Sequence, residues 1–291
     1  MRYHMDRIYT PKEGEKMKVA FMFSGGGTGL KTNIVSNLQH SDLYEVTFCL
    51  TDKPDCGGAE FSDALGIPTE TLDYREYADR YPDKKERREA YFSQVNDIMK
   101  VAGPDVIVTS GFMLIAVDPF VKDWYGKLMN GHPAETYLLT GPGVSIVDVG
   151  KMETRDVVEM YHKGGYTRKF TGGDAVYDAV VDGVREVKTA VFALDHGEDT
   201  GPNIVHSPAI PVDREYVDRL MKKGNAGGVR VYCGELQNLL KYYGDRPAIN
   251  KALELAATGR LGLDDSVLGE TGLPYLVTLD GEPLPYRGFQ M

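Results

Sequence analysis

The first half of the chain alternates short apolar runs with longer segments that are polar on one side. The apolar runs predict buried strands at residues 17–24, 44–50, 106–110 and 128–130, and a weaker pattern predicts a short strand at 71–73. The segments between them predict helices at residues 30–38, 57–65 and 86–101. This regular alternation is typical of an α/β protein with a doubly wound, mostly parallel sheet.

The second half follows a less regular pattern. Helices are predicted at residues 154–162, 175–182, 214–223, 230–242 and 249–257, and strands at 188–194 and 203–211. Residues 276–284 predict a small C-terminal hairpin around Asp280 and Gly281. The pattern weakens between residues 134 and 169, where the sequence predicts little beyond one helix.

Three segments rich in glycine or polar residues follow predicted strands. They are residues 24–29, 110–113 and 130–133. In doubly wound sheets the ligand lies beyond the carboxyl ends of the strands. We therefore expect these three segments to meet at one site, although they are far apart in the sequence.

The segment at residues 24–30, SGGGTGL, lies between a predicted strand and a predicted helix. Glycines there let backbone N–H groups face an anion at the helix N-terminus. The spacing fits neither GxGxxG nor a phosphate-binding loop ending in GKT or GKS. By itself the segment is compatible with a phosphate site or with a tight turn.

Three polar residues are candidates for catalysis. Asn130 and His132 are two apart on a strand, so they point to the same face and can polarise a carbonyl oxygen. Asp199 lies in an acidic turn, and a carboxylate beside an imidazole favours the charged ring and fixes its orientation. Taken singly, each is more typical of an ordinary turn residue.

Composition excludes several other classes of protein. The 291 residues are 42% hydrophobic and 26% charged, with a net charge of −10, which argues against non-specific nucleic-acid binding. No apolar run approaches the ~20 residues needed to span a membrane, and residues 1–18 lack a signal core. Three cysteines without a CxxC pair indicate reduced, buried thiols and a cytoplasmic protein. The histidines lack metal-ligand spacing, so no metal is expected.

The order of several short motifs is more specific than any one of them. The motifs resemble those of phosphoribosylglycinamide formyltransferases, a folate-dependent formyltransferase family of purine synthesis. The resemblance rests on residues 24–30, 66–69, 104–113, 130–133, 170–172, 199–202, 258–261 and 279–285. It implies a Rossmann-like formyltransferase fold in one domain at residues 18–291, with an N-terminal extension at 1–17 and an insertion at about 134–169.

The resemblance also implies roles for individual residues. Asn130, His132 and Asp199 match the catalytic asparagine, histidine and aspartate of the family. The remaining matches are Gly26, Gly27, Thr28 and Gly29 for the ribose phosphate, Glu235 near the acceptor amine, Met113, Leu114, Ile115, Leu194, Asp195 and His196 for the folate pocket, and Arg88 for the folate tail.

The implied reaction moves a formyl group from 10-formyltetrahydrofolate to the amine of glycinamide ribonucleotide. Asn130 and a protonated His132 would stabilise the tetrahedral oxyanion, with Asp199 keeping His132 charged or relaying a proton through water. The chain departs from the family at Gly29, where Asn is usual, and at Leu114, where Arg is common. Arg168 and Lys169, at the end of the insertion, either supply charge for a phosphate or form an ordinary solvated pair.

Several alternatives remain open on the sequence. A formyltetrahydrofolate deformylase would use the same three residues with water as acceptor, and another amine is compatible with the departures. A non-catalytic folate- or nucleotide-binding module, a tRNA formyltransferase and a dinucleotide oxidoreductase agree less well with the motifs. The expected partners are small-molecule substrates, with no nucleic acid and no membrane, and homodimer formation is left open.

Overall fold

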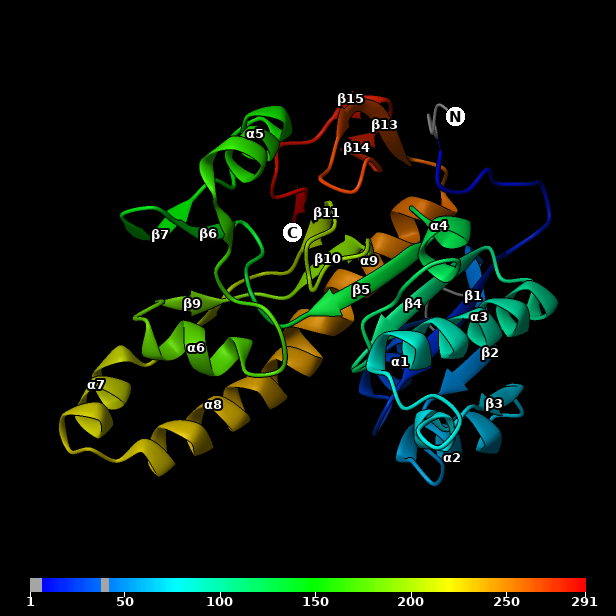
Figure 1. Cartoon of the computed structure of the whole chain (residues 1–291), viewed down its shortest axis with the longest axis horizontal. Coiled ribbons are helices and arrows are strands. Elements are labelled where there is room, and N and C mark those ends of the chain that lie inside the picture. Colours follow the sequence, from blue (N-terminus) through cyan, green and yellow to red (C-terminus); the bar gives the residue numbers. More distant parts are fainter. Residues whose placement is uncertain (1–6, 38–41) are drawn as a thin grey trace.

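A computed structural model describes residues 7–37 and 42–291 of the chain, so residues 1–6 of the expected extension and Leu38 of the first expected helix lie outside it. Its main feature is an eight-stranded sheet in the order β16-β11-β10-β5-β4-β1-β2-β3 (Figure 1). The first five strands along the chain are β1 (Met17–Phe23), β2 (Tyr44–Thr51), β3 (Thr69–Thr71), β4 (Val106–Ser110) and β5 (Leu128–His132).

These five strands form the parallel part of the sheet. Each pairs in parallel with its neighbours, and the strand order reverses between β1 and β4. The helices connecting them are α1 (Thr28–Asn37), α2 (Gly57–Ala64), the short η1 (Tyr74–Tyr77), α3 (Lys84–Ala102) and α4 (Phe120–Trp124). The predicted doubly wound sheet is confirmed. Its third strand begins two residues earlier than expected, because Asp73 caps η1 instead of continuing the strand.

Antiparallel strands complete the sheet beyond β5. β10 (Ala190–Ala193) pairs antiparallel with β5, β11 (Asn203–His206) pairs antiparallel with β10, and β16 (Phe289–Gln290) adds in parallel to β11. The predicted strand at 203–211 is split. Its end, β12 (Ile210–Pro211), pairs with β9 (Glu186–Val187) outside the main sheet, because Pro208 has no N–H to extend the ladder.

Residues 134–169 form a small unit of their own beside the sheet (Figure 1). Strands β6 (Leu138–Gly141), β7 (Val144–Asp148) and β8 (Thr167–Arg168) make a three-stranded antiparallel sheet, joined by α5 (Thr154–Gly164). The helix was predicted, and the strands were not. The unit shares a hydrophobic cluster with the C-terminal strands.

The C-terminal sheet contains the predicted hairpin. β14 (Pro274–Leu279) and β15 (Glu282–Pro283) pair antiparallel across Asp280 and Gly281, both of which have positive φ. β13 (Leu261–Leu268), which was not predicted, pairs along β14.

Helices α6 (Ala175–Val181), α7 (Arg214–Lys222) and α8 (Ala226–Leu240) form an arm that extends from the sheet (Figure 1). A π-helical turn, η2 (Lys241–Asp245), joins α8 to α9 (Arg246–Ala257), and α9 packs against the sheet. π-helical turns are rare and often occur at functional sites. None of the helices in the described ranges is long and apolar enough to cross a membrane.

Candidate active site

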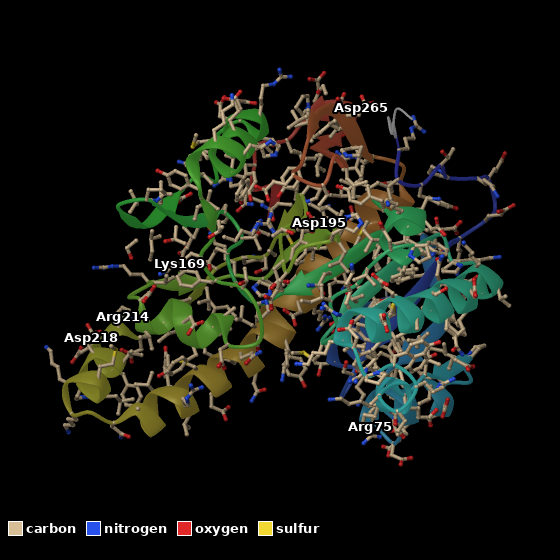
Figure 2. All side chains as sticks on the ribbon, viewed as in Figure 1. Arg75, Lys169, Asp195, Arg214, Asp218 and Asp265 are labelled. Atoms are coloured by element: carbon tan, nitrogen blue, oxygen red, sulfur yellow. The ribbon has the colours of Figure 1, made fainter. Side chains whose placement is uncertain are left out.

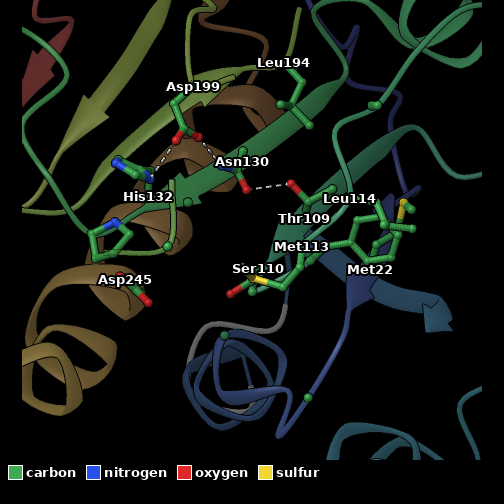
Figure 3. Close-up of a pocket in the computed structure, with 18 of the residues that line it drawn as sticks. Met22, Thr109, Ser110, Met113, Leu114, Asn130, His132, Leu194, Asp199 and Asp245 are labelled. Carbon is green, nitrogen blue, oxygen red and sulfur yellow. Dashed lines mark hydrogen bonds and ion pairs between the residues drawn. The ribbon is translucent and has the colours of Figure 1, made fainter. Parts of the chain in front are cut away.

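The loops at the carboxyl ends of β1, β4 and β5 enclose a cavity of about 400 Å³ (Figure 3). This is the size of a small-molecule site. The three segments that were expected to meet all line it, together with the turn after β10 and the junction of α8 and α9. Its predicted lining residues are Gly26, Gly27, Thr28, Gly29, Met113, Leu114, Ile115, Asn130, His132, Leu194 and Asp199.

Asp199 connects the other two candidate catalytic residues (Figure 3). Its Oδ2 lies 3.3 Å from Nδ1 of His132, and its Oδ1 accepts a hydrogen bond of 3.5 Å from Nδ2 of Asn130. The backbone N–H of Gly172 donates to the same carboxylate at 2.8 Å. Asn130 and His132 lie on β5 and Asp199 lies 67 residues later, so the fold brings together residues that the sequence could only list.

The amide of Asn130 is held in one orientation by Thr109. Thr109 lies directly beside Asn130 in the register of β4 and β5, and its hydroxyl donates to Oδ1 of Asn130 at 2.7 Å. The amide nitrogen therefore faces Asp199 and the cavity. Sequence reasoning missed Thr109, although its place at the end of the neighbouring parallel strand was a usable signal.

His132 is buried, with only 4% of its surface exposed. Its Nε2 lies 3.0 Å from the carbonyl oxygen of Phe170, opposite the nitrogen that faces Asp199. Burial lowers the pKa of His132 and outweighs Asp199 and the Phe170 carbonyl, which raise it, while the charge of Arg168 lowers it further. The direction of this shift runs against the expectation that Asp199 keeps the ring protonated, although both ring nitrogens face acceptor oxygens.

Arg168 and Lys169 take neither of the expected positions. Arg168 is 5% exposed and donates to the backbone of the turn that contains Asp199. Lys169 forms an ion pair of 2.8 Å with Asp182. Neither lines the cavity, so neither is placed to bind a phosphate there.

The glycine loop is shaped by two close approaches. Gly27 has a φ of +61°, and a Cβ there would lie 2.8 Å from Cα of Gly58. A Cβ on Gly29 would lie 2.1 Å from Oγ of Ser110. The hydroxyl of Ser110 thus occupies the space that a larger residue at position 29 would need.

The predicted folate wall is only partly present at the cavity. Met113, Leu114, Ile115 and Leu194 line it, but Asp195, His196 and Arg88 do not. The carboxylate of Asp195 accepts from the N–H of Gly197 at 2.9 Å and from Thr200, so it stabilises its own turn. His196 pairs with Asp118 at 2.7 Å, and Arg88 lies one helical turn before Phe92, which does line the cavity.

Glu235 also lies outside the cavity. On α8 the buried side is formed by Val229, Cys233, Leu236 and Leu240, and Glu235 is exposed. The residues of this region that reach the cavity are Gln237, Lys241 and Asp245, two of them on the π-helical turn. This placement corrects the expectation for Glu235.

Asp245 is the acidic residue on that side of the cavity (Figure 3). Its carboxylate accepts a 2.6 Å hydrogen bond from Thr189, and burial raises its pKa to about 6, against smaller opposing effects of Thr189 and Lys241. Sequence reasoning missed it because a change of helical period within a helix leaves no clear pattern. Within residues 7–37 and 42–291, no group of three His, Cys, Asp or Glu side chains is arranged to hold a metal ion.

Residues 17–136 match the formyl transferase family. Phosphoribosylglycinamide formyltransferase of Escherichia coli is 30% identical over 118 residues, which are 40% of this chain and 52% of that protein. The trifunctional purine biosynthetic protein adenosine-3 of Gallus gallus is 32% identical over 119 residues, 41% of this chain. The chain spans only 11% of the length of that trifunctional protein.

The fold is shared more widely than the sequence. The phosphoribosylglycinamide formyltransferase of Coxiella burnetii superimposes with a TM-score of 0.63 and 20% identity, over 95% of this chain and 100% of that protein. The predicted formyltransferase fold is therefore confirmed. The sequence match to the family ends at residue 136, near the start of the segment at 134–169.

Proposed function

We propose that the protein transfers a formyl group from 10-formyltetrahydrofolate to the amine of glycinamide ribonucleotide. The observation that carries the proposal is the contact of Asp199 with both Asn130 and His132 at the wall of one cavity. That cavity has a glycine loop at one side and apolar residues at another. Such a division suits a phosphorylated acceptor and a folate donor.

The glycine loop provides the phosphate site. Residues 25–29 line the cavity, and α1 begins among them at Thr28. The N–H groups of a helix N-terminus and the helix dipole both favour an anion there. Ser110 adds a hydroxyl beside Gly29, in place of the amide that the family usually has at position 29.

Asn130 and the His132–Asp199 pair perform the chemistry. The acceptor amine attacks the formyl carbon, and one N–H of Asn130 donates to the oxygen that becomes negative. The amine loses a proton, which the His132–Asp199 pair takes up as a unit and returns to the folate nitrogen as it leaves. A neutral imidazole can accept that proton, and burial, which lowers the pKa of His132, acts in the direction of this form.

Asp245 binds the acceptor amine in this scheme. Its carboxylate belongs to the lining of the same cavity as His132 (Figure 3). A carboxylate there can hold the amine by a charge-assisted hydrogen bond. We assign to Asp245 the role that the sequence suggested for Glu235.

We place the reaction in the cytoplasm. The three cysteines are buried and unpaired, and such thiols are common in that compartment.

The test is a turnover assay with the purified protein and 10-formyltetrahydrofolate, with and without glycinamide ribonucleotide. We expect tetrahydrofolate and formylated ribonucleotide to appear together and only when both substrates are present. Release of tetrahydrofolate without the ribonucleotide would instead indicate hydrolysis. No reaction in either mixture would contradict the proposal and would call for other acceptor amines.

A further inference from the structure

Arg168 is held behind the catalytic turn by an unusually large set of contacts. Nη1 donates to the carbonyl oxygen of Asp199, and Nη2 donates to that of Gly201 at 2.6 Å. Further contacts join the guanidinium to Asn203 (3.4 Å), Tyr275 (3.3 Å) and Tyr286 (3.2 Å). The side chain thus spans the two carbonyls on either side of Thr200.

All of these partners are neutral. No carboxylate lies within ion-pair distance of Arg168 in the part of the chain that the structure describes. A buried charge without a counter-ion is unfavourable unless its donors are satisfied, and a guanidinium offers five donors in a fixed plane. Such a site is suited to fixing backbone geometry, which Asp199 requires because its φ of 53° is uncommon for a residue other than glycine.

Arg168 comes from the end of the segment at 134–169, and the residues that follow it also reach the catalytic group. Phe170 places its carbonyl oxygen against Nε2 of His132, and Gly172 donates its N–H to Asp199. Residues 168–172 therefore contact the backbone of the turn, the imidazole and the carboxylate in succession.

We propose that Arg168 is a positioning residue that fixes the Asp199 turn from behind, so that the segment at 134–169 completes the catalytic site. The segment is then a structural part of the site. The contribution of this segment to turnover rests on the proposed formyl transfer. The effect of Arg168 on the pKa of His132 does not depend on that reaction.

Arg168 acts through geometry and through charge. Among the groups around His132, the carboxylates of Asp199 and Glu198 and the Phe170 carbonyl raise its pKa, while burial and the charge of Arg168 lower it. Removing the charge should therefore move the titration of His132 to higher pH. Lysine keeps the charge but lacks the planar fork that reaches both carbonyls.

The experiment uses the full chain with Arg168→Met, Arg168→Lys and, as a matched control, Arg214→Met. Arg214 also donates to a backbone carbonyl, that of Val180, and it lies on the arm away from the site (Figure 2). We would measure kcat and KM for both substrates and titrate the histidine rings by NMR, with His132→Ala to identify the signal of His132. Circular dichroism would establish that each variant is folded.

We expect Arg168→Met to reduce kcat by about 100-fold with little change in KM, because a misplaced catalytic group slows the reaction more than it weakens binding. Its His132 signal should titrate at higher pH than in the wild type. Arg168→Lys should keep the titration and lose part of kcat, and Arg214→Met should change neither.

A folded Arg168→Met protein with wild-type kcat, or with only a raised KM, would overturn the proposal. If Arg168→Met does not fold, wild-type kcat in Arg168→Lys would overturn it instead. If the wild type transfers no formyl group, the proposed function fails by itself. The NMR titration of Arg168→Met then still decides, and an unshifted His132 would overturn the positioning role.

Discussion

The site is built from two regions of the chain that position their side chains in different ways. Residues 17–132 supply the glycine loop, Asn130 and His132 from the ends of consecutive parallel strands. Residues 133–291 supply Asp199 and Asp245 from a turn and a helix junction, each held by residues distant in the sequence. Sheet topology places the first set at one edge of the sheet, whereas the second set depends on long-range contacts for its position. The proposed reaction requires Asp199, from the second set, to contact Asn130 and His132, from the first.

The substitutions with the largest expected effect remove the contact between His132 and Asp199 by changing either residue. His132→Ala and Asp199→Asn should each lower kcat by about 10³-fold, because both break the pair that stabilises charge in the transition state of the proposed reaction. Steady-state kinetics on the folded variants would measure this. If the loss in the double variant were the product of the two single losses, the residues would act independently and the pair would not be a unit.

Asp280→Asn is a suitable control for Asp199→Asn. Asp280 also has a positive φ, of 55°, but it lies in the C-terminal hairpin and pairs with Arg260. Both substitutions place asparagine in the same uncommon backbone conformation. Only the change at Asp199 should lower turnover, and an equal loss in both would indicate a backbone effect.

Most of the first region could be predicted because β1, β2 and β4 are rich in apolar residues. β4 was predicted to the residue at 106–110, and β1 and β2 to within one residue. Once the strands are known, their carboxyl ends identify the site. Asn130 and His132 were therefore found from local pattern, whereas Thr109, whose role needs the register of two strands, was missed.

In the second region, the positions of the site residues could not be predicted, because they depend on tertiary contacts. Arg168 looks like half of a solvated basic pair in the sequence, and only tertiary structure shows it buried against the carbonyls of a turn. Asp245 faces the cavity because a π-helical turn changes the helical phase after α8. Glu235 has the expected chemistry, but it lies on the exposed side of the same helix.

A comparison of Asp245 with Glu235 sharpens this contrast. Asp245→Asn should raise KM for the ribonucleotide by about 30-fold, the loss of roughly 2 kcal/mol expected when a charged hydrogen-bond partner is removed. Glu235→Gln should leave KM unchanged. Steady-state kinetics with the ribonucleotide varied would decide, and the reverse result would restore the assignment made from the sequence.

The pH dependence of KM tests the same carboxylate. Because burial raises the pKa of Asp245 to about 6, its charged form is lost as the pH falls through that value. In the wild type, KM for the ribonucleotide should therefore rise below pH about 6. In Asp245→Asn this rise should be absent, and a rise that persists would assign the titration to another group.

Glu135 lies at the boundary of the two regions. The smallest expected effect is that of its carboxyl group on the pH dependence of the free energy of unfolding. Glu135 is 2% exposed, its Oε2 has no hydrogen-bond partner within the described residues, and burial raises its pKa to about 8. A carboxyl whose pKa is raised on folding contributes its full stability below the pKa of the unfolded chain. That contribution is lost as the pH rises through about 8, because the folded protein must then hold a buried charge.

Glu135→Gln removes this titration while keeping the shape of the side chain. Its free energy of unfolding, measured by urea denaturation, should rise relative to that of the wild type by roughly 1–3 kcal/mol when the pH is changed from about 5 to about 8.5. Comparing two pH values cancels any constant effect of the substitution on packing. A difference independent of pH would mean that Glu135 is charged without penalty, so that the boundary between the two regions is more hydrated than the structure indicates.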